Sequence, residues 1–287
     1  MINATIVGIP LDLGAENLGV DIGPNAIRYQ NITEKLENSG FKISDVGNIS
    51  CTSRELLSIG SPKLKYLDEI LRVSELAAKI ICDLVNKKQK IIALGGDHSI
   101  CLGTVSGASA ALQNDPGLIY LDAHGDINTD RTSVTGNIHG MHLASLMGFG
   151  NQRLVQVFNK STKIKKNNLL HIGGYDLDSG EVELIKNEKL NTFKIIDILS
   201  NGLAPLFLKI DKLNTNVKDV WVSLDLDVID STYAPGAGMP NKAGLTYREI
   251  TTICDYVGKN SHVIGIDVVE YNPLQDLAQI IVGIQTI

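Results

Sequence analysis

Short runs of Ile, Val and Leu alternate along the chain with longer amphipathic stretches. Such runs are typical of buried parallel strands, and the amphipathic stretches are typical of helices that cover both faces of a sheet. Strands are predicted at residues 4–9, 41–45, 90–94, 117–121, 169–173, 192–196, 220–224 and 262–267. Helices are predicted at residues 24–37, 64–86, 104–112, 205–213 and 247–257. The pattern therefore predicts an α/β fold.

The same alternation occurs in a (β/α)8 barrel, so the pattern leaves a barrel and an open sheet as alternatives. Both architectures place binding and catalytic residues at the carboxyl ends of their parallel strands. Chemistry is therefore expected directly after the predicted strands. No linker-like segment divides the 287 residues, and we expect a single domain spanning residues 1–287.

The composition is that of an ordinary globular protein, with 44% hydrophobic and 20% charged residues. It argues against a disordered chain and against a fibrous repeat. The formal net charge of −6 disfavours nucleic acid and anionic membrane surfaces as partners, because a negatively charged protein repels both. A small cationic substrate is compatible with this charge.

Cysteine usage and the N-terminal segment both favour the cytoplasm. The four cysteines form no C-x-x-C pair, so neither a zinc ribbon nor a disulfide framework is indicated, and we expect reduced thiols. The chain leads straight into a predicted strand without a basic region, and no run of about 18 apolar residues occurs. We therefore expect a cytoplasmic protein without a membrane span.

Ionisable residues gather directly after three of the predicted strands. Residues 95–99 read GGDHS, residues 122–126 read DAHGD and residues 223–227 read SLDLD. In extended backbone, side chains at i, i+2 and i+4 share a face, so the last two segments each direct their ionisable groups to one side. The alternatives are a hydrogen-bonded turn for GGDHS alone and a solvated loop for SLDLD.

Four carboxylates at the ends of buried strands are costly unless cations neutralise them. Two divalent ions match their total charge. Oxygen-rich ligands with a minority of imidazole favour Mn²⁺ or a similar ion over structural zinc. We therefore predict a site for two metal ions with these ligands: His98, Asp122, His124, Asp126, Asp225 and Asp227.

In combination, the three motifs resemble those of the ureohydrolases, the family of arginase, agmatinase and formimidoylglutamase, over nearly the whole chain. The resemblance implies a three-layer α/β/α fold with an eight-stranded, mostly parallel sheet. It also implies two Mn²⁺ ions per subunit and a homo-oligomer, usually a trimer or a hexamer. In the implied ligand set, one metal is held by His98 and Asp126, the other by His124 and Asp227, and both by Asp122 and Asp225.

Residues 128–139 (NTDRTSVTGNIH) resemble the loop that receives the substrate α-carboxylate in the arginase branch of the family. Neutral hydrogen-bond donors suit a ligand that carries a full charge. Taken alone, the loop reads as a solvated turn, but its adjacency to the metal motif favours the binding role. Two acidic positions further along match those that meet the α-amino group. The implied substrate-binding residues are Asn128, Ser133, Thr135, Asn137, Asp178 and Glu181.

Three catalytic roles follow from the resemblance. Glu270 matches the position that binds the guanidinium group of the substrate. His139 matches the histidine that transfers protons at the mouth of the site. An imidazole with a pKa near neutrality suits proton transfer. Asp126 would carry a proton to the leaving amine. The other histidines match no catalytic position and are expected to be structural or at the surface: His142, His171 and His262.

The implied reaction is hydrolysis of L-arginine to L-ornithine and urea. Agmatinase, another guanidino or formimino hydrolase, and a catalytically impaired, metal-binding regulatory protein stay open as alternatives, because the chain departs from the family pattern. Tyr175 stands where arginine is usual, Met239 where threonine is usual, and Ser231 and His142 where proline is usual. We also expect the last element, after Asp276, to be shorter than in the family.

Overall fold

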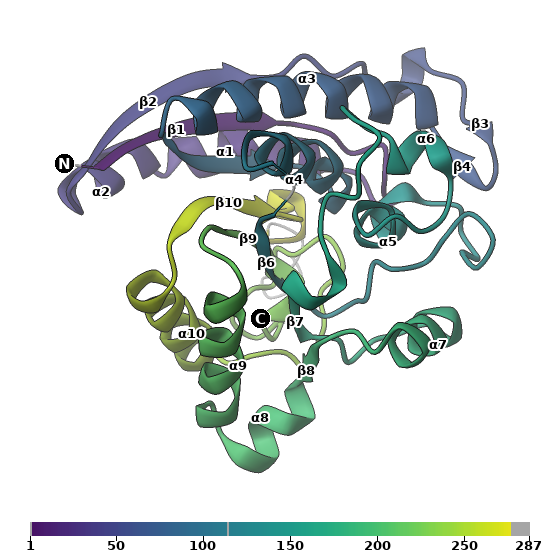
Figure 1. Ribbon diagram of the computed structural model, residues 1–287. Helices are drawn as coiled ribbons and strands as arrows, with labels where there is room; N and C mark the ends of the chain where they lie inside the picture. Colours follow the sequence, from purple (N-terminus) through teal and green to yellow (C-terminus); the bar gives the residue numbers. More distant parts are fainter. Residues whose placement is uncertain (1, 114, 277–287) are drawn as a thin grey trace, which may run out of the picture.

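The computed structural model describes residues 2–113 and 115–276, and its middle layer is an open sheet of eight strands (Figure 1). Each neighbouring pair of these strands is parallel. The sheet ends at β2 on one side and at β8 on the other, so the barrel alternative is wrong. In spatial order, the strands are β2 (Phe41–Asn48), β1 (Ile2–Ile9), β5 (Lys90–Gly95), β10 (Val263–Val269), β9 (Val220–Asp225), β6 (Gly117–Asp122), β7 (Leu169–Gly173) and β8 (Thr192–Lys194).

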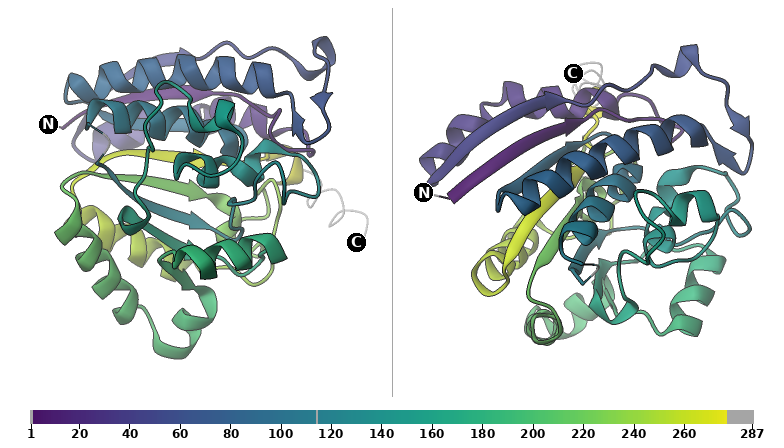
Figure 2. Two further views of the ribbon diagram at one scale, coloured as in Figure 1. Left: turned by 45° about the vertical axis from the view of Figure 1, so that its right-hand side comes forward. Right: turned by 45° about the horizontal axis from the view of Figure 1, so that its top comes forward.

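Alternate residues of each strand face opposite helical layers. Leu118 and Tyr120 of β6 pack against the first group of helices, whereas Ile119 and Leu121 pack against the second. The first group is α3 (Leu67–Asn86), α4 (Cys101–Ala111), α5 (His142–Leu146), α6 (Gln152–Val155) and α7 (Ser179–Glu188). The second is α8 (Ile195–Asn201), α9 (Ala204–Asn216) and α10 (Tyr247–Asn260). Figure 2 shows α3 and α8–α10 on opposite sides of the sheet, which confirms the three-layer α/β/α prediction.

The remaining elements are short. Helices α1 (Gly23–Tyr29) and α2 (Ile32–Asn38) pack near the β2 edge, and Pro24 lies in the first turn of α1 as expected. Strands β3 (Gly60–Ser61) and β4 (Leu64–Lys65) form an antiparallel hairpin outside the main sheet. The 3-10 helices are η1 (Val20–Ile22), η2 (Arg54–Leu56), η3 (His98–Ile100), η4 (Ile138–Met141), η5 (Lys166–Asn168) and η6 (Leu226–Val228).

All eight predicted strands are present, but the bounds of several predicted elements differ from the observed ones, and in three cases the local backbone explains the difference. Residues 24–37 form two helices, because Asn31 has a left-handed backbone with φ of 56° that interrupts the helical hydrogen bonds. The helix predicted from residue 64 begins at Leu67, because residues 64–65 form β4 and Tyr66 has φ of 53°. The strand predicted over 192–196 ends at Lys194, where α8 begins.

Other expectations concern thiols, membranes and the end of the chain. All four cysteines are free thiols. Within residues 2–113 and 115–276, no helix has the length and hydropathy needed to cross a membrane. The expected shortening after Asp276 falls on residues 277–287, outside the described part of the chain.

Candidate metal centre and substrate pocket

Four neighbouring strands in the middle of the sheet, β5, β10, β9 and β6, supply the ionisable residues. His98 opens the helix η3 that follows β5, and Glu270 directly follows β10. Asp122 and Asp225 are the last residues of β6 and β9. Because these strands are parallel and adjacent, their carboxyl ends meet at one edge of the sheet. Side chains from segments far apart in the sequence therefore lie together.

A first cluster surrounds the ring of His98. Its Nδ1 lies 2.9 Å from Asp122 Oδ2, 3.1 Å from Asp225 Oδ2 and 3.5 Å from Asp126 Oδ2. The other ring nitrogen, Nε2, lies 2.9 Å from Ser223 Oγ. Hydrogen bonding to Ser223 fixes the ring so that Nδ1 faces the carboxylates.

A second cluster surrounds His124. Its Nδ1 lies 2.9 Å from Asp227 Oδ2 and 3.5 Å from Asp122 Oδ1. Asp122 thus offers Oδ2 to the first cluster and Oδ1 to the second. Adjacent ligands of an octahedral ion with bonds of about 2.1 Å lie about 3 Å apart, which is close to the separations in both clusters. The donor atoms therefore fit a pair of divalent ions joined through Asp122.

The charges of these clusters also favour cations. Burial and the neighbouring carboxylates raise the pKa of Asp225 and of Asp126 well above the usual range, and the same causes raise the pKa of Asp227 to about 6. Burial alone would also raise the pKa of Asp122. Hydrogen bonds from His124 and His98 outweigh this effect, so the pKa of Asp122 is lowered. The raised pKa values arise partly because the carboxylates repel one another. Cations placed between the carboxylates would remove this repulsion.

Two acidic residues of the site have left-handed backbones that are unusual for residues other than glycine. The φ angle is 52° at Asp126 and 59° at Glu270. Tertiary contacts hold both: the Asp126 carbonyl accepts from Leu143 N–H at 3.1 Å, and Glu270 N–H donates to the Gly96 carbonyl at 2.8 Å. Strained residues of this kind are typical of functional sites.

A pocket of about 590 Å³ opens over the two clusters. His124, Asp126, Asp225 and Asp227 form its floor, whereas His98 and Asp122 lie buried below it. Every residue that the family resemblance implied for substrate binding or catalysis lines this pocket: Asn128, Ser133, Thr135, Asn137, Asp178, Glu181, His139, Asp126 and Glu270. The structure thus brings the two predicted groups of residues, metal-binding and substrate-binding, into one site.

Two lysines of the β3–β4 hairpin form hydrogen bonds with the loop of residues 128–139. Lys63 Nζ donates to the Ser133 carbonyl at 2.8 Å, and Lys65 Nζ donates to Asn137 Oδ1 at 3.0 Å. An ammonium group can only donate, so the amide oxygen of Asn137 faces Lys65 and its NH2 group faces acceptors, among them the Glu16 carboxylate. Lys65 also pairs with Glu16 at 2.5 Å. Neither lysine was among the residues predicted from the sequence.

Asp178 and Glu181 have a structural role that the sequence analysis also missed. Asp178 is the N-cap of α7, and Glu181, the third residue of the helix, is its partner in a capping box. Glu181 Oε2 accepts from Asp178 N–H at 2.9 Å, and its Oε1 accepts from Ile127 N–H at 3.1 Å. Asn128 Nδ2 donates to Asp178 Oδ2 at 2.9 Å. These contacts fix the loop and α7 relative to each other at one wall of the pocket.

Glu270 and His139 lie side by side at the pocket. Glu270 Oε1 accepts from His98 N–H at 2.9 Å and lies 3.5 Å from His139 Nδ1. A Cβ atom at Gly238 would lie only 2.2 Å from Glu270 Oε2, so glycine leaves room for the carboxylate there. Burial opposes charging of His139, but the Glu270 carboxylate outweighs it and raises the pKa of His139 to about 9.

Three residues that differ from the family pattern, Met239, Tyr175 and Ser231, have different structural environments. Met239 lines the pocket and is 43% exposed, so a side chain larger than threonine narrows its mouth. The hydroxyl of Tyr175 donates to the Asp227 carbonyl at 3.3 Å, beside the second cluster. Ser231 N–H donates to the Asn241 carbonyl at 2.7 Å, a bond that proline could not make.

The histidines without an expected catalytic role lie as follows. His262 is exposed and pairs with Asp219 at 2.6 Å. His171 is buried in β7. His142 is also buried, and its Nε2 lies 3.1 Å from the hydroxyl of Tyr120. Sequence analysis did not single out Tyr120, although its position two residues before Asp122 places both on one face of β6.

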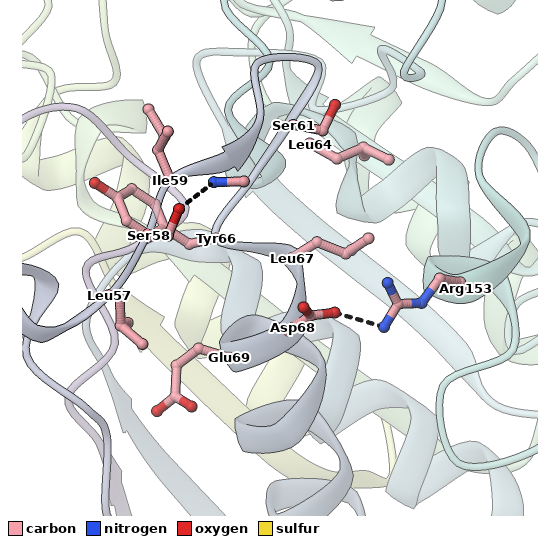
Figure 3. A pocket seen from close by; sticks show the side chains of 11 residues that line it. Leu57, Ser58, Ile59, Ser61, Leu64, Tyr66, Leu67, Asp68, Glu69 and Arg153 are labelled. Carbon is pink, nitrogen blue, oxygen red and sulfur yellow. Dashed lines mark hydrogen bonds and ion pairs between the residues drawn. The ribbon is translucent and has the colours of Figure 1, made fainter.

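A second, smaller pocket of about 320 Å³ lies beside the β3–β4 hairpin (Figure 3). Leu57, Ile59, Leu64 and Leu67 line it together with an ion pair in which Arg153 Nη2 lies 2.7 Å from Asp68 Oδ1. As far as the chain is described, its lining includes the carboxylates of Asp68 and Glu69 but no histidine.

Comparison with known proteins gives the family. A sequence model of the Arginase family matches residues 2–285. The chain belongs to the arginase family. The arginase of Brevibacillus brevis is 41% identical over 275 residues, which cover 96% of this chain and 92% of that protein.

Solved arginase structures have the same fold as this arginase-family chain. The Bacillus caldovelox arginase matches with a TM-score of 0.92 and 36% identity, covering 96% of this chain and 92% of its own. The Entamoeba histolytica arginase, crystallised in complex with L-ornithine, matches with a TM-score of 0.88 and 27% identity, covering 95% and 92%. The ureohydrolase resemblance is thereby confirmed.

Proposed function

We propose that the protein is an arginase that hydrolyses L-arginine to L-ornithine and urea with two Mn²⁺ ions. One observation carries the proposal: a single pocket has carboxylates of both acidic clusters in its floor, Glu270 beside them, and residues of the 128–139 loop in its wall. The arginase names of relatives at up to 41% identity support it. A guanidinium at the floor and an α-carboxylate at the loop match this distribution of charge and hydrogen-bond donors.

Two divalent ions would be held by the six predicted ligands. When bound, such a pair supplies hydroxide for attack on the guanidinium carbon, because coordination lowers the pKa of water from about 15.7 to about 7. Manganese suits the mixture of carboxylate oxygens and imidazole nitrogens better than structural zinc does.

The chain itself would orient the substrate and move protons. The Glu270 carboxylate pairs with the guanidinium and turns its central carbon toward the clusters. Asp126, at the floor of the pocket, is placed to pass a proton to the leaving amine. His139, half-buried near the mouth and next to Glu270, is placed to exchange protons with solvent as the products leave.

A substrate panel tests the proposal directly. Metal-free protein is loaded with Mn²⁺, and urea is measured with arginine, agmatine and guanidinobutyrate, while formamide is measured with formimidoylglutamate. Arginine is expected to give by far the largest kcat/KM. A preference for agmatine would make the protein an agmatinase, and loaded protein without product from any of the four would favour the regulatory alternative.

Assembly and location are further parts of the proposal. We propose a homo-oligomer, trimeric or hexameric, that works in the cytoplasm on a small cationic guanidino substrate. Light scattering of the purified protein gives its mass in solution, and a monomeric mass at working concentration would contradict the oligomer.

A His139→Asn variant tests the proton-transfer role. We expect kcat to fall by about 10²-fold, since general acid–base groups typically contribute that much or more. Both metal ions stay bound, because His139 belongs to neither cluster. Steady-state kinetics with metal analysis measures both effects. His262→Asn, which alters an exposed histidine, is the matched control, and a kcat for His139→Asn equal to that of the control would refute the role.

A Lys65→Met variant tests how the loop recognises a carboxylate. Without the ammonium, the Asn137 amide loses its fixed orientation and the mouth loses a positive charge. We expect the inhibition constant for ornithine to rise about tenfold, since a hydrogen bond to a charged group is worth about 1.5–3 kcal/mol. The constant for putrescine, which has no carboxylate, stays unchanged.

Lys63→Met is the matched control for this test. Among the residues that the structure describes, the Lys63 ammonium donates to a backbone carbonyl of the same loop and to no side chain, so its loss is expected to change the constants for both ligands alike. An equal change for ornithine and putrescine in Lys65→Met would show that Lys65 merely supports the loop.

A further inference from the structure

Three of the four carboxylates in the metal clusters are each held by a backbone N–H group. Asp122 Oδ1 accepts from His124 N–H at 2.7 Å, Asp225 Oδ1 accepts from Asp227 N–H at 2.9 Å, and Asp227 Oδ1 accepts from Ala123 N–H at 3.1 Å. In each case a backbone N–H group fixes Oδ1. The other oxygen, Oδ2, faces the Nδ1 atom of a histidine. This arrangement orients three ligands before any ion arrives.

Asp126 is held differently. Among the described residues, its carboxylate accepts a hydrogen bond only from a side chain, the hydroxyl of Tyr120, at 2.6 Å. Asp126 also has the left-handed backbone with φ of 52°, so its main chain turns away from the extended geometry of Asp122. The Tyr120 hydroxyl therefore donates the hydrogen bond to Asp126 that a backbone N–H group donates to each of the other three carboxylates.

The phenol of Tyr120 is itself held in place. The side chain is completely buried in β6, and its ring stacks on that of His98 with centroids 4.8 Å apart. Its hydroxyl lies 2.8 Å from Asp122 Oδ2 and 3.1 Å from His98 Nδ1, two atoms of the first cluster. It has no described contact with the carboxylates of Asp225 or Asp227. Of the two metal clusters, the hydroxyl meets only atoms of the first, so its effect on ligand geometry should be largest there.

His142 also contacts the hydroxyl of Tyr120. Its Nδ1 meets the backbone carbonyl of His139, which can only accept, so Nδ1 carries the hydrogen. In the neutral ring, Nε2 is then an acceptor 3.1 Å from the Tyr120 oxygen, so it competes with the carboxylates for the hydroxyl hydrogen. The hydroxyl has one hydrogen, and Asp126 Oδ2 is its nearest acceptor.

We propose that Tyr120 is a positioning residue of the metal centre, whose hydroxyl orients the Asp126 carboxylate as a ligand of the ion in the first cluster. The inference rests on the metal-binding part of the proposed function and not on the identity of the substrate. Residues that orient metal ligands typically contribute about 10–100-fold to metal affinity. A role limited to core packing would not distinguish between the two ions.

Manganese titration of Tyr120→Phe tests the proposal, because phenylalanine keeps the ring and removes only the hydroxyl. Free Mn²⁺ is counted by its electron paramagnetic resonance signal as it is added to metal-free protein. We expect the wild type to bind two ions, and the variant to bind one of them about 10–100-fold more weakly while the other is unchanged. Two ions with wild-type affinities in Tyr120→Phe would overturn the proposal.

Tyr175→Phe is the matched control, since its hydroxyl meets a backbone carbonyl beside the second cluster and, within the described parts of the chain, no carboxylate oxygen. It is expected to bind both ions as the wild type does. Failure of the wild type to bind two ions would instead count against the proposed function. The two failures are therefore distinguishable.

A second measurement covers the case in which Tyr120→Phe does not fold. Fluorotyrosine placed at position 120 gives a ¹⁹F resonance, which is followed as diamagnetic Zn²⁺ is added to the otherwise unaltered protein. The resonance is expected to shift in step with the filling of one site and then to stay constant. A resonance that Zn²⁺ leaves in place while two ions bind would also overturn the proposal.

Discussion

An Asp225→Ala variant is expected to lose the ion of the first cluster and nearly all urea production together. Asp225 Oδ2 lies 3.1 Å from His98 Nδ1, and its removal leaves the first cluster with two carboxylates. Metal ions contribute several kcal/mol to catalysis of this kind, so a loss of about 4 kcal/mol corresponds to a fall of about 10³-fold in kcat. Urea release and metal content per chain are measured on the same sample.

Thermal unfolding separates loss of metal from loss of fold. An ion that binds the native state raises the unfolding midpoint, so Mn²⁺ stabilises the wild type. The Asp225→Ala protein is expected to unfold cooperatively without metal but to gain less from added Mn²⁺. Asp219→Ala, which removes a carboxylate just before the opposite end of the same strand, should respond to Mn²⁺ as the wild type does. A fully active Asp225→Ala enzyme with its full metal content would refute the metal centre.

The strands were predictable from the sequence because their apolar runs are short, buried and separated by amphipathic stretches. Their spatial order was not, since β10 lies between β5 and β9 although it is the last of the eight along the chain. Pairing of this kind depends on packing between distant segments, which periodicity does not report. The break at Asn31 also escaped prediction, because the residues on both sides of it have helical periodicity.

The clustering of the six proposed metal ligands could be predicted, because each lies at or just after a strand end and parallel strands bring such ends together. The supports around them were harder to recognise. Tyr120 looks like an ordinary core residue, and only its contact with Asp126 shows another role. Lys65 comes from a hairpin remote in sequence from Asn137, so only the folded structure joins them. Asp178 and Glu181 have capping-box spacing, a signal that was present in the sequence and not used.

A Glu270→Gln variant is expected to keep both metal ions and to lose about 10²–10⁴-fold in kcat/KM for arginine. Glutamine has nearly the same shape, and its amide oxygen can still accept from His98 N–H, as Glu270 Oε1 does at 2.9 Å. What disappears is the negative charge, in a side chain only 4% exposed. Removing one partner of a buried ion pair costs about 3–5 kcal/mol, from which the expected loss follows.

The separation of metal binding from activity is what makes this variant decisive. Manganese titration should give two ions with wild-type affinities, because the Glu270 carboxylate is absent from both clusters. Glu249→Gln, in the capping box of α10, is the matched control for the chemical change. If Glu270→Gln lost an ion, Glu270 would have to be counted among the groups that hold metal. If it kept full kcat/KM, the guanidinium would have to be held by another group of the pocket.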